Sequence, residues 1–264
     1  MTRIELGRYG FCVDEDVDAA ALEQSGFGAL WINGGRLDRL DRLTDLLRST
    51  SAVAVGSAII PPDRYRPAEV AALFEHSETI APGRLVVGLG IPHQPGALAE
   101  LTGYLDALPV PRDRMLLAAL GPRALELARD RFAGALPMLY TPERTAWARG
   151  ILGPDRTLSV GLYAVLDEDP AAARAAAARP LSFLTTLPSY RTSLRRQGFS
   201  DTDVDDLSDR LVDALVAWGS AQQIIGHAKL LHDAGADHVA LTVLGSPTQP
   251  TGVAAARLLA AESG

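Results

Sequence analysis

The turn that ends at Arg123 has residue types suited to binding an anion. A buried, apolar run over Met115–Leu120 is followed by Gly121 and Pro122, and an amphipathic helical pattern begins there. Gly121 gives a tight turn its backbone freedom, and Pro122 suits the first helical position because its missing N–H is no loss there. Free N–H groups at the helix start, with Arg123 in the first turn, favour a phosphate-bearing ligand. An ordinary strand-to-helix turn is the alternative.

Two polar residues follow other apolar runs and are the candidate catalytic residues. Asn33 ends the run that starts at Ala29, and His93 lies just beyond the run Leu85–Ile91. An asparagine donates and accepts hydrogen bonds but cannot act as a general acid. A histidine titrates near neutral pH, so His93 is the candidate proton donor. An exposed loop histidine without a role is the alternative for His93.

The remaining titratable candidates indicate structural roles. His227 and His232 lie on one helical pattern, His238 opens the last strand at the bottom of the fold, and Cys12 is expected to pack as a small apolar side chain. No set of histidine and carboxylate residues has the spacing of a metal site, so no metal is expected.

These residues require a scaffold that brings several strand ends together. Eight strands are predicted, separated by amphipathic helical patterns: Ile4–Val13, Ala29–Asn33, Ala52–Ile60, Leu85–Ile91, Met115–Leu120, Ala135–Tyr140, Thr157–Leu166 and His238–Leu244. Eight alternating units are typical of an α/β fold of the (β/α)8 TIM-barrel type, and we expect a single domain over residues 1–264. A doubly wound open sheet fits less well, because no G-x-G-x-x-G follows the first strand.

A long helical region interrupts this repeat before the last strand. We expect a helical insertion over about residues 170–235, placed over the barrel mouth or at a subunit contact. Ser200 with Asp203, and Ser220 with Gln223, have the spacing of capping boxes and predict two helix starts. An apolar stripe from Val204 to Trp218 predicts one continuous helix.

Composition indicates a cytoplasmic enzyme rather than a nucleic-acid or membrane protein. The chain has 264 residues, 47% of them hydrophobic, a net charge of −7 and one cysteine. The negative charge disfavours a nucleic-acid surface, and no apolar run is long enough to span a membrane. Nearly all basic residues are arginine, which is typical of a GC-rich, for example actinobacterial, genome.

The sequences of several segments, and their order along the chain, resemble the luciferase-like monooxygenase superfamily, in particular its coenzyme F420-dependent (deazaflavin) oxidoreductase branch. The resemblance covers most of the chain and is most specific from the third strand onward. It rests on the segments 56–72, 83–93, 116–145, 190–199, 209–219 and 233–244.

The resemblance implies a cofactor site at the carboxyl ends of the strands. It implies a non-prolyl cis peptide at Ser57 and Ala58, behind the deazaflavin ring, and close approach of the ring to Gly88 and Gly90. Small residues in a barrel strand, and glycines that serve bends, are the structural alternatives. The cofactor phosphate would lie on the turn formed by Ala119, Leu120, Gly121, Pro122 and Arg123.

The resemblance also implies the reaction class. Relatives bind F420 or FMN, often as homodimers, and act on small molecules. Deazaflavin exchanges only hydride, so an F420 enzyme would transfer hydride to or from a small organic substrate. An FMN-dependent monooxygenase or reductase is the nearer alternative. A barrel that binds the cofactor without catalysis is the other, because Asn33 stands where many relatives carry an acid or histidine.

Overall fold

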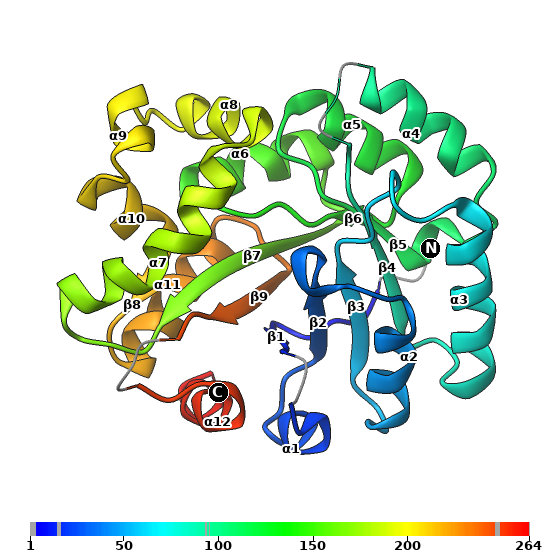
Figure 1. Cartoon of the computed structure of the whole chain (residues 1–264), viewed down its shortest axis with the longest axis horizontal. Coiled ribbons are helices and arrows are strands. Elements are labelled where there is room, and N and C mark those ends of the chain that lie inside the picture. The colour runs from blue at the N-terminus through cyan, green and yellow to red at the C-terminus, as the bar shows by residue number, and fades with distance from the viewer. Residues whose placement is uncertain (1–3, 15–16, 93, 95, 246–248, 264) are drawn as a thin grey trace.

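The computed structural model describes residues 4–14, 17–92, 94, 96–245 and 249–263. Within these residues all strand pairs are parallel and form one sheet (Figure 1). The strands are β1 (Tyr9–Cys12), β2 (Ala29–Asn33), β3 (Ala54–Ala58), β4 (Leu85–Leu89), β5 (Met115–Leu117), β6 (Gly134–Ala135), β7 (Thr157–Val165), β8 (Val216–Trp218) and β9 (His238–Val243).

Eight of these strands close into a barrel. Strands β1 to β7 follow one another around the ring, and β9 closes it by pairing with both β7 and β1. The predicted (β/α)8 barrel is confirmed, with all eight expected strands present; the second has the predicted bounds and the other seven are shorter. The sixth strand, expected over Ala135–Tyr140, ends at Ala135 because Pro137 has no N–H for the ladder and Leu139 has a positive φ of 57°.

Helices follow the strands and cover the outside of the barrel (Figure 1). They are α1 (Ala19–Gln24), α2 (Asp41–Arg48), α3 (Pro67–Ile80), α4 (Ala97–Asp106), α5 (Pro122–Arg131), α6 (Pro142–Leu152), α7 (Pro170–Thr185), α8 (Pro188–Arg196), α9 (Asp201–Asp205), α10 (Asp209–Leu215), α11 (Ala221–Asp233) and α12 (Gly252–Ala261). Short 3-10 turns lie at Gly34–Arg36 and Arg112–Arg114. Pro122 occupies the first position of α5, and both predicted capping boxes are present.

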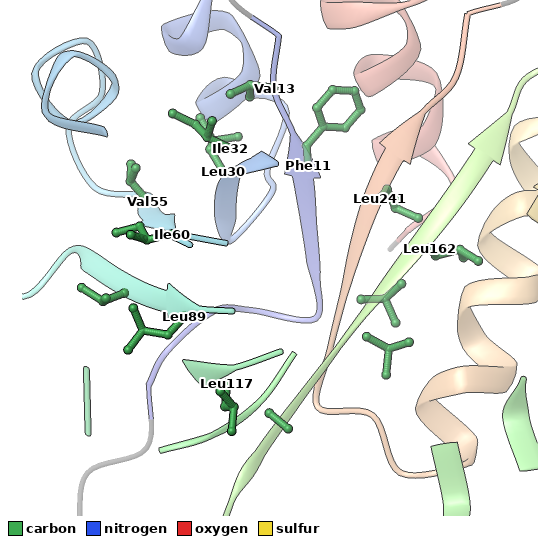
Figure 2. Packing of buried hydrophobic residues seen from close by; sticks show 14 of the residues in the cluster. Phe11, Val13, Leu30, Ile32, Val55, Ile60, Leu89, Leu117, Leu162 and Leu241 are labelled. Atoms are coloured by element: carbon green, nitrogen blue, oxygen red, sulfur yellow. The ribbon is translucent and has the colours of Figure 1, made fainter. Parts of the chain in front are cut away.

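The largest hydrophobic cluster lies between the strands and the surrounding helices. Alternate strand residues such as Leu30, Val55 and Leu89 belong to it (Figure 2). Helix residues such as Val70 and Leu125 belong to it as well. Because successive side chains of a strand point to opposite faces, the residues between them point into the barrel.

A smaller cluster fills the barrel interior around Trp31. Its other buried members come from strands or the segment before β1, and none comes from a helix: Leu6, Cys12, Ala29, Val86, Leu116 and Ala240. The indole of Trp31 crosses the interior, so a Cβ on Gly56 would collide with its ring and one on Gly10 would lie 2.6 Å from its Nε1. Glycines on the flanking strands therefore give the indole its space.

Helices α7 to α10 form the insertion and pack on a separate cluster. That cluster joins them to Tyr163 and Val165 at the carboxyl end of β7, whereas α11 packs on the main core with the other barrel helices. The single helix expected from Val204 to Trp218 is wrong. Leu207 has a positive φ of 48° between α9 and α10, and Val216–Trp218 extends along the edge of β7 as β8.

Candidate functional site

The β5–α5 turn begins a helix whose N-terminus lacks a side-chain cap. Gly121 is the residue before α5, and in the part of the chain that the structure describes no side chain accepts a hydrogen bond from the first helical N–H groups. These groups and the helix dipole are therefore available to an anion. The expectation that Gly121 provides backbone freedom is wrong, because its φ of −120° is open to any residue.

The nearest group to Gly121 across the turn is the end of an arginine side chain. A Cβ there would lie 3.1 Å from Nη1 of Arg196, the last residue of α8. Arg196 is exposed, and among the described residues its guanidinium makes no hydrogen bond or ion pair. Arg123 is also exposed, in the first turn of α5. Arg196 is thus a second cation at the predicted phosphate turn.

Gln197 fixes the end of α8 beside this turn. Its Oε1 accepts the N–H of Thr141 at 2.9 Å, and its Nε2 donates to the carbonyl oxygen of Leu139 at 3.1 Å. The insertion is therefore bonded to the β6–α6 connection, and Arg196 is positioned by that attachment. Arg196 and Gln197 lie in the segment 190–199, which carries part of the family resemblance. The sequence alone does not indicate the role of Arg196, because only folding places it beside Gly121.

Tyr140 and Arg144 hold the backbone just before Gly121. The Tyr140 hydroxyl lies 3.0 Å from the carbonyl oxygens of both Ala119 and Leu120, and Nη2 of Arg144 donates to Leu120 at 2.9 Å. The guanidinium of Arg144 also stacks 3.3 Å from the ring centroid of Trp147. Burial raises the pKa of Tyr140, so its phenol stays protonated. The turn is thereby held in one conformation.

Ser57 and Gly88 bind each other at the ends of β3 and β4. The Ser57 hydroxyl donates to the Gly88 carbonyl oxygen at 3.0 Å and accepts the Gly88 N–H at 2.9 Å. Ser57 is fully buried, and a Cβ on Gly88 would collide with its carbonyl oxygen. The strand approach is therefore the reason for a glycine at position 88.

A non-prolyl cis peptide bond lies at the end of β3, one residue later than expected. It joins Ala58 to Ile59, and Ser57 and Ala58 both still pair with β2. Ile59 lies against Gly34 and Gly90. A Cβ on Gly34 would lie 2.8 Å from the Ile59 carbonyl oxygen, and a Cβ on Gly90 would collide with the Ile59 side chain. Glycines thus surround this end of β3.

Polar side chains gather at the carboxyl ends of β1, β2 and β9. Nδ2 of Asn33 donates to Oγ1 of Thr242 at 3.4 Å, and both side chains lie beside Cys12. Burial raises the pKa of the Cys12 thiol to about 11 despite hydrogen bonds from Thr242 and Asn33. The thiol is therefore neutral near pH 7 and serves as a small packing group. Arg36 and Asp14 form an ion pair on the neighbouring loops.

The four histidines considered in the sequence fall into two groups. His93 lies outside the described residues. His227, His232 and His238 are buried or partly buried, and burial lowers the pKa of each. Within the described part of the chain no group of three His, Cys, Asp or Glu residues could hold a metal ion, and no helix has the length and apolarity needed to cross a membrane.

Solved structures of known oxidoreductases share this barrel over almost its full length. An F420-dependent secondary alcohol dehydrogenase, in complex with an F420–acetone adduct, superposes with a TM-score of 0.73 at 14% identity, covering 97% of this chain and 98% of the other. The coenzyme F420-dependent tetrahydromethanopterin reductase from Methanopyrus kandleri gives 0.73 at 18% identity, with 99% and 98% covered. This chain has the luciferase-like barrel fold.

The same luciferase-like barrel also occurs in an FMN-containing structure. The oxygenating constituent of 3,6-diketocamphane monooxygenase from Pseudomonas putida, in complex with FMN, gives a TM-score of 0.68 at 11% identity, with 97% and 98% covered. No family model matches the sequence, and no curated protein matches it either. At these identities the comparisons establish the fold.

Proposed function

We propose that this luciferase-like barrel is an oxidoreductase that binds coenzyme F420 and transfers a hydride to or from a small organic substrate. The observation that carries the proposal is the unpaired guanidinium of Arg196 beside Gly121, at the uncapped N-terminus of α5. A helix N-terminus with two nearby arginines, neither of them bonded to a carboxylate among the described residues, is suited to a phosphate.

The residues of the site fit a phosphate-bearing cofactor. The backbone from Leu120 to Arg123, with Arg196, would hold the phosphate, and the glycine-lined end of β3 and β4 would lie behind the ring. Bound deazaflavin would supply the hydride chemistry, so the protein has mainly to bind, orient and shield its substrate. Two solved F420-dependent enzymes with TM-scores of 0.73 support F420 over FMN.

Asn33 and His93 are the proposed catalytic residues. The Asn33 amide is held by Thr242 at the barrel mouth, where it can orient a polar group of ring or substrate. It cannot supply a proton, so this task is assigned to His93. An Asn33→Ala variant should lower turnover less than a His93→Ala variant, whose loss should be about 100-fold or more.

Substitution of Arg196 tests the phosphate site directly. Arg196→Ala should weaken F420 binding about tenfold at low salt, the loss of one partly exposed charge-assisted contact. Arg195→Ala is the matched control, because the neighbouring Arg195 is paired with Asp201 at 2.6 Å. Calorimetric titration of both variants checks this. Equal F420 affinity in the two variants would remove Arg196 from the site.

The FMN alternative shares the same phosphate contacts and therefore the same Arg196 dependence. F420 and FMN differ in the ring that would lie at the barrel mouth. Only a direct comparison of the two affinities therefore distinguishes the F420 proposal from the FMN alternative.

A further inference from the structure

A cavity of about 480 Å³ lies at the amino end of the barrel, opposite the proposed cofactor site. Thr157, the first residue of β7, and His238, the first residue of β9, both line it. Leu6, in the segment before β1, adds an apolar wall. Pockets of about 300–1,000 Å³ hold small organic ligands, so this cavity has room for such a molecule.

Trp31 and His238 separate this cavity from the barrel mouth. The indole of Trp31 crosses the interior and donates its N–H to Nε2 of His238 at 3.0 Å. Thr242, which contacts Asn33 at the mouth, lies four residues beyond His238, about 13 Å along β9. A ligand in the cavity would therefore not compete with a cofactor at the mouth.

The hydroxyl of Thr157 is an orphaned polar group in the wall of the cavity. Thr157 is 2% exposed, and its Oγ1 has no hydrogen-bond partner in the described part of the chain. Its side chain lies on the inward face of β7, since the neighbouring Leu158 packs in the cluster under the helices. Buried hydroxyls normally have partners, because leaving one unpaired costs free energy. The orphaned hydroxyl therefore indicates a ligand with a polar group.

The charges around the cavity favour a cation. Glu5 and Asp237 line it, and none of its described lining residues is lysine or arginine. Asp237 is compensated, because its Oδ2 accepts a hydrogen bond from Arg149 at 2.5 Å. Glu5 is exposed and makes no ion pair with any described residue. His238 adds no positive charge at neutral pH, since burial lowers its pKa to about 4. One carboxylate charge is thus left for a ligand.

We propose that this cavity binds a small organic amine in its protonated form, recognised by the Glu5 carboxylate and the Thr157 hydroxyl. The ammonium group donates hydrogen bonds to these oxygens, and the carbon skeleton packs against Ile4 and Leu6, which also line the cavity. Amine binding here is independent of the proposed function, because the cavity and the cofactor site share no residue.

Titration with three cyclohexane derivatives that differ in charge tests the inference on the whole chain. The probes are cyclohexylammonium, cyclohexanol and cyclohexanecarboxylate, measured by calorimetry at pH 7 and low salt. The variants are Thr157→Val, which removes the hydroxyl, and Glu5→Gln, which removes the charge. Thr44→Val is the matched control, because Thr44 is buried and its hydroxyl donates to the Asp41 carbonyl oxygen at 2.8 Å.

The wild type should bind cyclohexylammonium about tenfold more tightly than cyclohexanol, and cyclohexanecarboxylate more weakly than either. Thr157→Val should lose about fivefold in amine affinity and Glu5→Gln about threefold, the effects of one hydrogen bond and one exposed charge. Thr44→Val should bind the amine as the wild type does, and F420 affinity should be the same in all variants. No amine binding, or equal affinities for amine and alcohol, would overturn the inference and leave the cofactor assignment untouched.

Thermal unfolding without ligand shows whether the Thr157 hydroxyl is free for a ligand. Thr157→Val should unfold at the wild-type temperature or above it, because no hydrogen bond of the fold is lost. Thr44→Val should unfold about 2–4 °C lower, since its hydroxyl has a partner. A Thr157→Val variant that unfolds as low as Thr44→Val, or that binds the amine as tightly as the wild type, would contradict the assignment of Thr157 to the site.

Discussion

The indole of Trp31 donates a hydrogen bond to Nε2 of His238 at 3.0 Å, across the interior of the barrel from β2 to β9. Because Nε2 accepts this bond, the imidazole proton lies on Nδ1, which donates to the Gly7 carbonyl oxygen at 2.8 Å. Both ring nitrogens are satisfied in the neutral form. His238 is therefore part of the barrel core, as expected of a histidine at the bottom of the last strand.

Acid should weaken the fold through His238. Burial lowers its pKa from 6.5 to about 4, so the folded state disfavours the protonated ring. Below pH 6.5 the unfolded chain binds the proton more readily, and the free energy of unfolding falls as the pH drops towards 4 and then levels off. The loss over this window is on the order of 3 kcal/mol.

Urea unfolding between pH 7.5 and pH 4 checks this dependence, with His238→Gln as the comparison. The variant keeps a hydrogen-bonding side chain but cannot titrate, so its unfolding free energy should fall less steeply. His227 and His232, whose pKa values are also lowered, contribute to the slope that remains, and carboxylates with lowered pKa values such as Glu23 add to it near pH 4. Parallel pH profiles for wild type and variant would refute the role of His238.

Glu23 should stabilise the α2–β3 connection in a lower pH window. Its carboxylate accepts the N–H groups of Ser51, Ala52 and Val53 and the Ser51 hydroxyl, and these bonds lower its pKa from 4.5 to about 2. The stabilisation is present above pH 4.5 and lost as the pH falls towards 2. Glu23→Gln should cost about 1–2 kcal/mol at pH 7, since solvent screens part of the interaction.

Chemical denaturation at pH 7 measures the Glu23 effect, with the exposed Glu126→Gln on α5 as control. A loss in Glu23→Gln no larger than in the control would mean that the connection does not depend on the carboxylate.

Sequence patterns predicted the scaffold well, because local rules determine it. Alternation and helical periodicity predicted the eight barrel strands, and Pro122 at the first position of α5 follows from its missing N–H. The same patterns failed where pairing with a distant strand decides the local structure. The stripe ending at Trp218 has helical spacing, yet Val216–Trp218 pairs with the edge of β7, a partner that local pattern does not reveal.

The candidate site was predictable in its location but not in its side-chain partners. The turn before Pro122 was found from residue types, whereas Arg196 reaches it from α8, far along the chain. Ser57 and Gly88 were assigned from resemblance to the cofactor site, and the structure adds that their polar groups bond each other. The polar groups that remain free to contact a ligand depend on contacts of this kind between distant segments. The sequence of one segment does not show them.

Two glycines should respond differently to the same substitution. Gly88→Ala places a Cβ against the rigid Ser57 backbone and should lower the free energy of unfolding by more than about 2 kcal/mol. Gly121→Ala meets only the mobile end of Arg196, at a φ open to alanine, and should change it by less than about 0.5 kcal/mol. Thermal unfolding of both variants decides this. A large loss of unfolding free energy in the Gly121→Ala variant would contradict this expectation. It would mean that the fold itself, and not a ligand, requires glycine in the turn.

The central claim is that this barrel binds F420, and the most direct measurement is a titration of the purified protein with F420 and with FMN under identical conditions. Fluorescence or calorimetry gives both dissociation constants. We expect F420 to bind at least about tenfold more tightly than FMN, a difference of about 1.4 kcal/mol in binding free energy. FMN binding that equals or exceeds F420 binding would contradict it.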